Sequence, residues 1–192
     1  MIPTHKIAIK LFTAADSFEK SEFVPIFHHW IQNQDLPGHA LIDVADYAHV
    51  IDGPGTALIA SEANIYMDRG EGRLGLLYVR KQPIAGLLPA VAATLQAATK
   101  LQADSSLGGR LKFRTDEMSI RFNDRLAIPN TPATFEAMRP DIESAARLLA
   151  GGGQIQIENH NPSPLTLLDV RVKFSQSPAL AELLRRANSP QA

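Results

Sequence analysis

Carboxylate and imidazole side chains gather around one loop in the first half of the chain. Asp43, Asp46 and His49 fall within seven positions, and Glu62 ends the apolar run that follows the loop. Oxygen and imidazole ligands of this kind suit zinc, manganese or iron. One interpretation is therefore a divalent metal site formed by Asp46, His49 and Glu62, with His28 from the preceding helix as a further ligand. These residues lack the spacing of established metal motifs such as HExxH.

The same cluster is also compatible with an acid–base enzyme that needs no metal. An imidazole titrates near neutral pH, so His49 can carry a proton when Asp43 or Asp46 orients its ring, and Glu62 offers a further carboxylate. The sequence contains no GxSxG motif and no cysteine, which excludes a cysteine nucleophile, thiolate metal ligands and disulfides. The structural alternative is a turn whose Asp and His side chains only form hydrogen bonds with the backbone.

A protein that binds a small, anionic molecule is the function we expect, with its pocket near residues 43–62. Polar and ionisable side chains concentrate in this segment, between the first predicted helix and the strands that follow. The ligand-binding candidates are Tyr47, beside the aspartates, and Tyr78 and Arg80 further along the chain. Tyr78 and Arg80 alternate with apolar neighbours, so they share one side of a predicted strand and line a pocket if that strand is central.

The overall composition limits the classes of partner. The chain has 192 residues, is 45% hydrophobic and carries a formal net charge of -1. That apolar fraction excludes a disordered chain, and the balance of 19 basic and 20 acidic residues argues against nucleic acid and anionic membranes as partners. Apolar stretches stay below the roughly 18 residues that a membrane-spanning helix needs. We therefore expect a cytoplasmic protein.

Basic residues are nevertheless distributed unevenly over the predicted strands. Eight of the 19 fall opposite the apolar side chains of their strands, and these are Lys6, Lys10, Arg110, Lys112, Arg114, Arg121, Arg171 and Lys173. If the strands share a sheet, one face is cationic and suits phosphates, acidic metabolites or RNA. Because Glu117, Glu158 and Asp169 share this alternation, we expect an ordinary solvated face instead.

Hydrophobic periodicity predicts an α+β fold in a single domain, residues 1–192. The expected order is strand, helix, four strands, helix, two strands, helix, two strands, helix, with a mostly antiparallel sheet and the helices packed on one face. The predicted strands and helices are 5–12, 17–36, 40–46, 56–62, 64–68, 74–81, 87–102, 110–115, 117–123, 132–149, 154–160, 165–174 and a short final helix from Pro178. Several short antiparallel strands are also typical of sheets that pair in a homodimer, so an assembly module is a third candidate function.

One hairpin and one internal repeat are specific expectations within this order. Residues 110–123 predict a hairpin whose two-residue turn is Thr115 and Asp116, which places Arg114 opposite Glu117. Residues 87–123 and 132–174 then each consist of a helix followed by a hairpin. This order indicates a weak αββ repeat.

Three segments resemble an uncharacterised bacterial family of similar length. They are the run LIDVADYAHV at 41–50, Gly53-Pro54-Gly55, and LYVRK at 77–81. The similarity extends to RFNDR at 121–125, whereas the part of the chain from about Gln154 lies outside it. Because the family has no known activity, the resemblance implies a bacterial cytoplasmic protein and no catalytic role.

Overall fold

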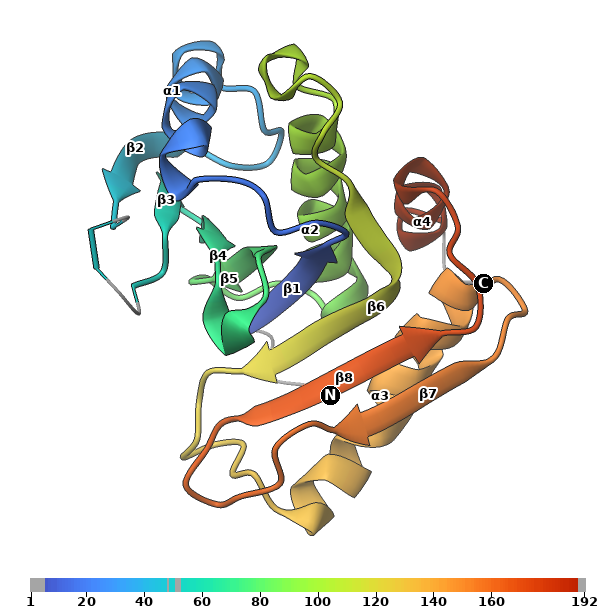
Figure 1. Cartoon of the computed structure of the whole chain (residues 1–192). Helices are drawn as coiled ribbons and strands as arrows, with labels where there is room; N and C mark the ends of the chain where they lie inside the picture. Colours follow the sequence, from blue (N-terminus) through green and yellow to red (C-terminus); the bar gives the residue numbers. More distant parts are fainter. Residues whose placement is uncertain (1–5, 48, 51–52, 190–192) are drawn as a thin grey trace.

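The computed structural model describes residues 6–47, 49–50 and 53–189, which form one eight-stranded antiparallel sheet and four α-helices (Figure 1). The strands are β1 (Ile7–Thr13), β2 (Leu41–Asp46), β3 (Thr56–Ala60), β4 (Ala63–Asp68), β5 (Gly75–Arg80), β6 (Phe113–Phe122), β7 (Ile155–Asn159) and β8 (Leu168–Phe174). The helices are α1 (Val24–Asn33), α2 (Leu87–Gln102), α3 (Pro132–Ala150) and α4 (Leu180–Ala187), with short 3-10 turns η1 (Lys20–Phe23), η2 (Gly70–Gly72) and η3 (Ser105–Leu107).

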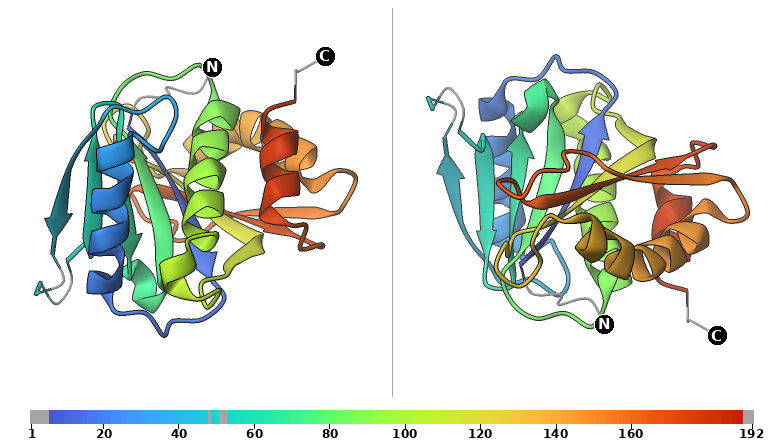
Figure 2. Two further views of the ribbon diagram at one scale, coloured as in Figure 1. Left: turned by 90° about the horizontal axis from the view of Figure 1, so that it is seen from above. Right: turned by 90° about the horizontal axis from the view of Figure 1, so that it is seen from below.

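The sheet has the strand order β2-β3-β4-β5-β1-β6-β8-β7, with helices on one face. In the centre α2 packs on β1 and β5, while α3 packs on β7 and β8 and α1 lies beside β2. Helix α4 fits against α2, and Figure 2 shows α1, α2 and α4 in a row when the molecule is seen from above. The opposite face, which we call the open face, has no α-helix over the described strands and is turned towards the viewer in Figure 1, where β8 passes in front of α3.

Alternation along the strands explains why one face meets the helices. Ile7, Ile9 and Leu11 of β1 are buried on the side of α2, and Ala8 and Lys10 fall on the open face. Small side chains on α2, several of them fully buried alanines, allow this helix to lie close to the sheet. The predicted α+β class, with a mostly antiparallel sheet, is thereby confirmed.

The predicted hairpin at residues 110–123 is wrong. Residues 113–122 form one continuous strand, β6, which passes through Thr115 and Asp116 and pairs with β1 on one side and β8 on the other. Neither Thr nor Asp in this pair supplies the glycine that a two-residue turn prefers, and two partner strands favour an extended chain. Arg114 forms its ion pair with Asp116, at 2.7 Å, and lies 3.7 Å from Glu117.

The αββ repeat is wrong for the same reason. Residues 87–123 contribute one helix and a single strand, whereas residues 132–174 contribute α3 followed by two strands. The observed order is therefore strand, helix, four strands, helix, strand, helix, two strands, helix. Among the described residues, none of these helices combines the length and the apolar character that crossing a membrane requires.

We predict that Gly75→Ala destabilises the centre of the sheet. Gly75 lies opposite Phe12 of β1, and a Cβ at this position would lie 2.5 Å from the carbonyl oxygen of Leu11 and 2.9 Å from Cε of Lys10. Because the first of these atoms is backbone, the strands must separate, and we expect the free energy of unfolding to fall by about 1–3 kcal/mol in urea denaturation.

Gly153→Ala is the matched control. The nearest atoms to a Cβ at Gly153 lie at 3.4 Å, which is ordinary van der Waals contact, and its backbone is not in the left-handed region. We expect a change within about 0.5 kcal/mol. An equal loss in the two variants would contradict the close approach of β1 and β5.

Candidate functional site

The structure does not bring the acidic residues of the predicted site together. In the pairing of β2 with β3, Asp43 lies opposite Ile59 and Asp46 lies opposite Thr56, so the two carboxylates point to opposite faces of β2. Glu62 lies at the other end of β2, where its carboxylate accepts a hydrogen bond of 2.9 Å from the amide of Ala40. The length of the strand, roughly 15–20 Å, therefore separates Glu62 from Asp46.

The remaining members of the predicted metal site are exposed and dispersed. His28 is exposed on α1, and His49 is exposed in the loop after β2, where Tyr47 is 40% exposed. Asp52, which follows His49 in the same polar segment of the sequence, lies outside the described residues. Among the residues that the structure describes, no group of three or more His, Asp and Glu side chains is arranged to hold a metal ion. The described geometry therefore does not bring Asp43, Asp46 and Glu62 to one point, and an acid–base role for His49 stays a prediction.

Tyr78 and Arg80, the other ligand-binding candidates, do lie together. Both belong to β5, which is the fourth of eight strands, and both line one cavity on the helix side of the sheet. Arg80 donates a hydrogen bond of 3.2 Å to the hydroxyl of Tyr78. The condition that their strand is central is met, and their role in ligand binding stays a prediction.

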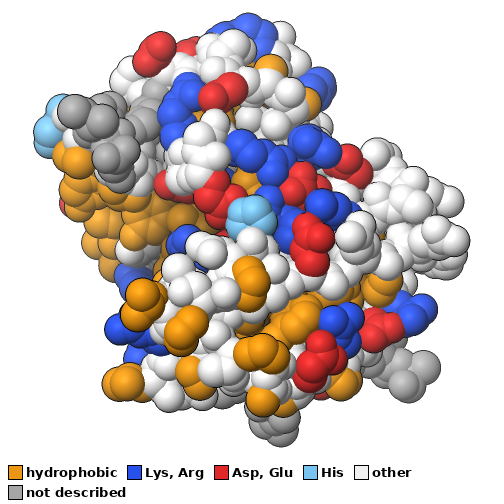
Figure 3. All heavy atoms as spheres, turned by 60° about the horizontal axis from the view of Figure 1, so that its bottom comes forward, with side chains coloured by type: hydrophobic (Ala, Val, Ile, Leu, Met, Phe, Trp, Pro, Cys, Tyr) orange, Lys and Arg blue, Asp and Glu red, His pale blue; other side chains and the backbone are white. Residues whose placement is uncertain are grey.

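Polar chemistry is concentrated instead on the open face, over β1, β6 and β8. In Figure 3, basic and acidic side chains gather on this side of the molecule around a histidine. Strand register explains the arrangement, because Lys10 pairs with Ser119 and Ser119 with Arg171 in one row. In the adjacent row Arg121 lies opposite Asp169 in the strand register, without an ion pair between their side chains, both of which the structure describes.

The centre of this face is buried, which corrects the expectation of a solvated cationic surface. Arg171 is 2% exposed and Lys10 is 6% exposed, and the acidic residues Glu117 and Asp169 are each 7% exposed. Burying an unpaired charge costs several kcal/mol, so charges at this depth require partners. Glu117 and Asp169 therefore supply negative charge that the buried cations of this face require.

Arg171 is at the centre of a network of ion pairs. Its guanidinium lies 2.7 Å from the carboxylate of Glu117 and 2.8 Å from that of Glu71. Arg73 binds the same Glu117 carboxylate with two hydrogen bonds, of 3.0 and 2.8 Å. Lys10 pairs separately with Asp68 at 2.7 Å. The paired charges compensate one another where water is excluded.

The ring of Phe12 forms the floor under these cations. Phe12 is fully buried, and the guanidinium carbons of Arg73 and Arg171 lie 3.7 and 4.7 Å from its ring centroid. The ammonium of Lys10 lies 5.4 Å from the same centroid. Attraction between a cation and an aromatic face strengthens as water is removed, so Phe12 helps to stabilise three positive charges on a largely buried surface.

The turn η2 brings Glu71 over the open face. Glu71 has φ of 62° and ψ of 23°, in the left-handed region that a residue with a side chain seldom adopts. A strained backbone of this kind costs on the order of 1 kcal/mol and persists where other interactions fix it. Here the ion pair with Arg171 offsets the cost.

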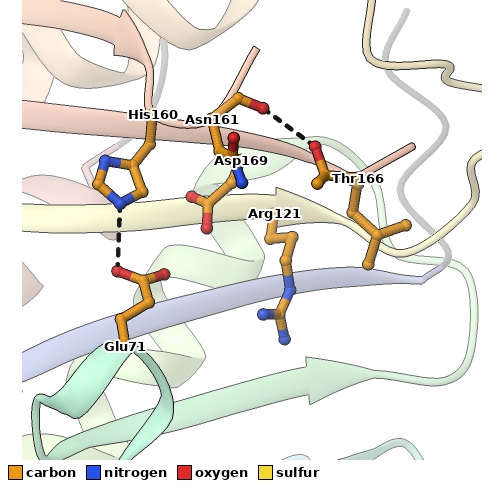
Figure 4. Close-up of a pocket in the computed structure, with 7 residues that line it drawn as sticks. Glu71, Arg121, His160, Asn161, Thr166 and Asp169 are labelled. Carbon is orange, nitrogen blue, oxygen red and sulfur yellow. Dashed lines mark hydrogen bonds and ion pairs between the residues drawn. The ribbon is translucent and has the colours of Figure 1, made fainter. Parts of the chain in front are cut away.

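Two adjoining hollows lie beside this network, and Figure 4 shows residues that line one of them. They have volumes of about 250 and 120 Å³ and share Glu71, Arg121 and Asp169 in their walls. Asp169 accepts a short hydrogen bond of 2.5 Å from the hydroxyl of Ser119. At the rim, Nε2 of His160 lies 3.4 Å from the carboxylate of Glu71. We refer to the two together as the open-face hollow.

Both carboxylates that hold Arg171 ionise readily. Two hydrogen bonds from Arg73, with a further one from Arg171, hold the pKa of Glu117 at about 2 against the opposing effect of burial. Burial raises the pKa of Glu71, but the hydrogen bond from Arg171 and the nearby charges of Arg171, His160 and Lys10 outweigh it and lower the pKa overall. The network is therefore fully charged at neutral pH.

Sequence alternation identified some of these residues and missed others. It placed Lys10, Arg121, Arg171 and Asp169 on one face correctly. The missed residues are Phe12, Glu71 and His160. The sequence signal for Glu71 is a carboxylate between two glycines in a turn, which many solvated turns share.

Comparisons with known proteins do not assign the open-face hollow. No protein-family model matches the chain, and no curated protein or solved structure matches it. The function proposed for the hollow therefore rests on the chemistry of its side chains.

We predict that Glu117→Gln lowers stability and weakens its dependence on pH. The pKa of Glu117 is about 2 in the folded protein and near its ordinary value of 4.5 in the unfolded chain. A lowered pKa means that the stabilisation is complete above pH 4.5 and is lost as the pH falls towards 2. At neutral pH we expect a loss of about 3–5 kcal/mol, because two arginines lose a buried partner.

Urea denaturation at a series of pH values measures this effect. Glu136→Gln on α3 is the control, because Glu136 is 62% exposed and pairs only at the surface with Arg139, so its loss costs at most about 1 kcal/mol. Parallel pH profiles for the wild type and Glu117→Gln below pH 4.5 would contradict the role given to Glu117.

Proposed function

We propose that the protein binds a small polar molecule with an acidic group in the open-face hollow. The observation that carries the proposal is the charge of Arg121, which lines both parts of the hollow. Within the described ranges of the chain, its guanidinium has no carboxylate partner, whereas Lys10 and Arg171 are paired. A ligand with an acidic group supplies the missing partner.

The geometry of Arg121 suits such a ligand. Its Nε donates a hydrogen bond of 3.2 Å to the side-chain oxygen of Asn123, so the other two nitrogens of the guanidinium keep donors for a ligand. In Figure 4 the Arg121 side chain extends from β6, to the lower right of Asp169 in the view. A guanidinium binds carboxylate or phosphate oxygens with two parallel hydrogen bonds, so both kinds of acidic group fit this position.

Asp169 defines a second requirement for the ligand. One of its carboxylate oxygens accepts the hydrogen bond from Ser119, and the side chain lines both parts of the hollow. A carboxylate only accepts hydrogen bonds, so it favours a hydroxyl or ammonium group on the ligand. The volume of about 250 Å³ is below that of common drug-sized pockets, which favours a metabolite with few atoms over a nucleotide.

We predict that malate binds more tightly than succinate, which lacks only the hydroxyl group, and that Arg121→Gln weakens both at least about tenfold. Asp169→Asn is expected to reduce the difference in affinity between malate and succinate. A side-chain amide can both donate and accept hydrogen bonds, so it no longer favours a ligand with a hydroxyl group. Binding is measured by calorimetry and by the shift of the Arg121 side-chain resonance in NMR, with inorganic phosphate as a further probe.

Arg139→Gln on α3 is the control for the loss of one positive charge, since Arg139 lies on a helix on the opposite side of the sheet from the hollow. It should leave all affinities unchanged. If none of the three probes shifts the Arg121 resonance, or if Arg121→Gln binds malate as the wild type does, the proposal is wrong.

Assembly through the open face of β2 to β5 is a second candidate function. Ile59, Tyr66 and Val79 fall on this part of the open face and are partly exposed, and no described helix covers them. Apolar side chains on an uncovered sheet face are typical of interfaces between copies of one chain. Sedimentation equilibrium that shows a monomer at all concentrations would rule out this function, and Ile59→Asp should dissociate any dimer.

A further inference from the structure

A second cavity, of about 310 Å³, lies on the helix side of the sheet. It opens between the turn that follows α1 and the first half of α2, near the end of β5. Much of its wall is apolar, namely Pro37, Ile84, Pro89, Ala92 and Ala93. The cavity therefore differs from the open-face hollow, whose walls are mostly polar.

Three polar side chains form a hydrogen-bonded chain at one end of this cavity. The hydroxyl of Tyr78 lies 3.0 Å from Nε2 of His39 and 3.2 Å from the guanidinium of Arg80. A guanidinium only donates hydrogen bonds and a carbonyl only accepts them, so the Tyr78 oxygen accepts from Arg80 and Nδ1 of His39 donates to Pro37 at 3.3 Å. In the neutral imidazole, Nε2 is then left to accept from the O–H of Tyr78.

Burial favours the neutral form of His39, and the hydrogen bond to Pro37 only partly opposes it. Burial is the main cause that lowers the pKa of the imidazole, and it also raises the pKa of the Tyr78 hydroxyl. Among the described residues that line the cavity, Arg80 is then the side chain with a permanent positive charge. The polar end of the cavity is cationic because of that one group.

The charge of Arg80 has no carboxylate in contact within the part of the chain that the structure describes. Its Nε donates to the carbonyl of Gln82 at 2.9 Å, and another nitrogen lies 3.5 Å from the carbonyl of Pro83. The nearby Glu62 carboxylate is engaged by the amide of Ala40. Carbonyl dipoles orient the guanidinium without neutralising it, and Glu62 acts on it only from a distance, so an anion in the cavity gains a direct charge interaction with Arg80.

We propose that this cavity is a second binding site, specific for a monoanionic carboxylic acid with an aromatic or branched aliphatic body. The carboxylate binds Arg80 beside the Tyr78 hydroxyl, and the apolar body packs against Ala92 and Ala93 of α2. This selectivity is opposite to that of the open-face hollow, where Asp169 favours a polar ligand. The two sites lie on opposite sides of the sheet and are independent.

Phenylacetate is the probe, and neutral phenylacetamide is its matched control ligand. We expect phenylacetate to shift the NMR resonances of Tyr78 and Ala93 and to bind at least about tenfold more tightly than phenylacetamide. Arg80→Gln should remove that preference. Ala93→Leu, which fills the cavity without touching the charge, should abolish binding of both compounds.

Two control variants test whether binding depends on this cavity. Ala133→Leu adds the same side chain at an exposed position of α3 and should bind phenylacetate as the wild type does. Arg121→Gln should also leave phenylacetate binding unchanged while it weakens malate, which separates this site from the open-face hollow. Equal affinity for phenylacetate and phenylacetamide, or unchanged binding by a folded Ala93→Leu variant, would overturn the proposal, as would shifts confined to the open face.

Discussion

The burial of Arg171 is the constraint on which the arrangement of the open face depends. A guanidinium that is 2% exposed cannot lose its proton, so the protein must place negative charge against it. Glu117 supplies one carboxylate from the adjacent strand, and Glu71 supplies the other from a turn that follows β4. One buried charge thus ties β6 and β8 to η2 and fixes a backbone conformation that Glu71 would otherwise avoid.

Each of the two proposed binding sites contains an arginine that lies outside the ion-pair network. Arg121 on the open face and Arg80 on the helix side each line a cavity, and neither has a carboxylate partner among the described residues. Their surroundings differ, since Asp169 and His160 accompany Arg121, whereas small apolar residues of α2 accompany Arg80. In the two sites that we propose, the same type of side chain binds a polar acid on one side of the sheet and an apolar acid on the other.

The sequence was sufficient for most elements because their signals are local. Alternation in β1, helical spacing in α2 and the glycines after α3 each depend on a few neighbouring residues, and these elements formed as predicted. The predicted hairpin at Thr115 is wrong because pairing with β1 and β8, which is not local, decides whether β6 continues.

Proximity along the chain also suggested a site at Asp43, Asp46, His49 and Glu62. Its carboxylates are separated because Asp43 and Asp46 point to opposite faces of β2 and Glu62 lies at the other end of that strand. The open-face hollow instead combines residues from η2, β6, β8 and the turn after β7, and no local pattern connects them.

The position of β1 has a consequence for how the protein is made. The first strand of the chain lies in the middle of the sheet, between β5 and β6, both of which follow much later in the sequence. During synthesis β1 emerges long before either partner exists, and closing such long loops makes folding slow. Until β6 is complete, the β1 edge that carries Ile7, Ile9 and Leu11 has no partner strand on that side. Refolding should therefore be limited by the insertion of β1, and aggregation should compete with it at that step.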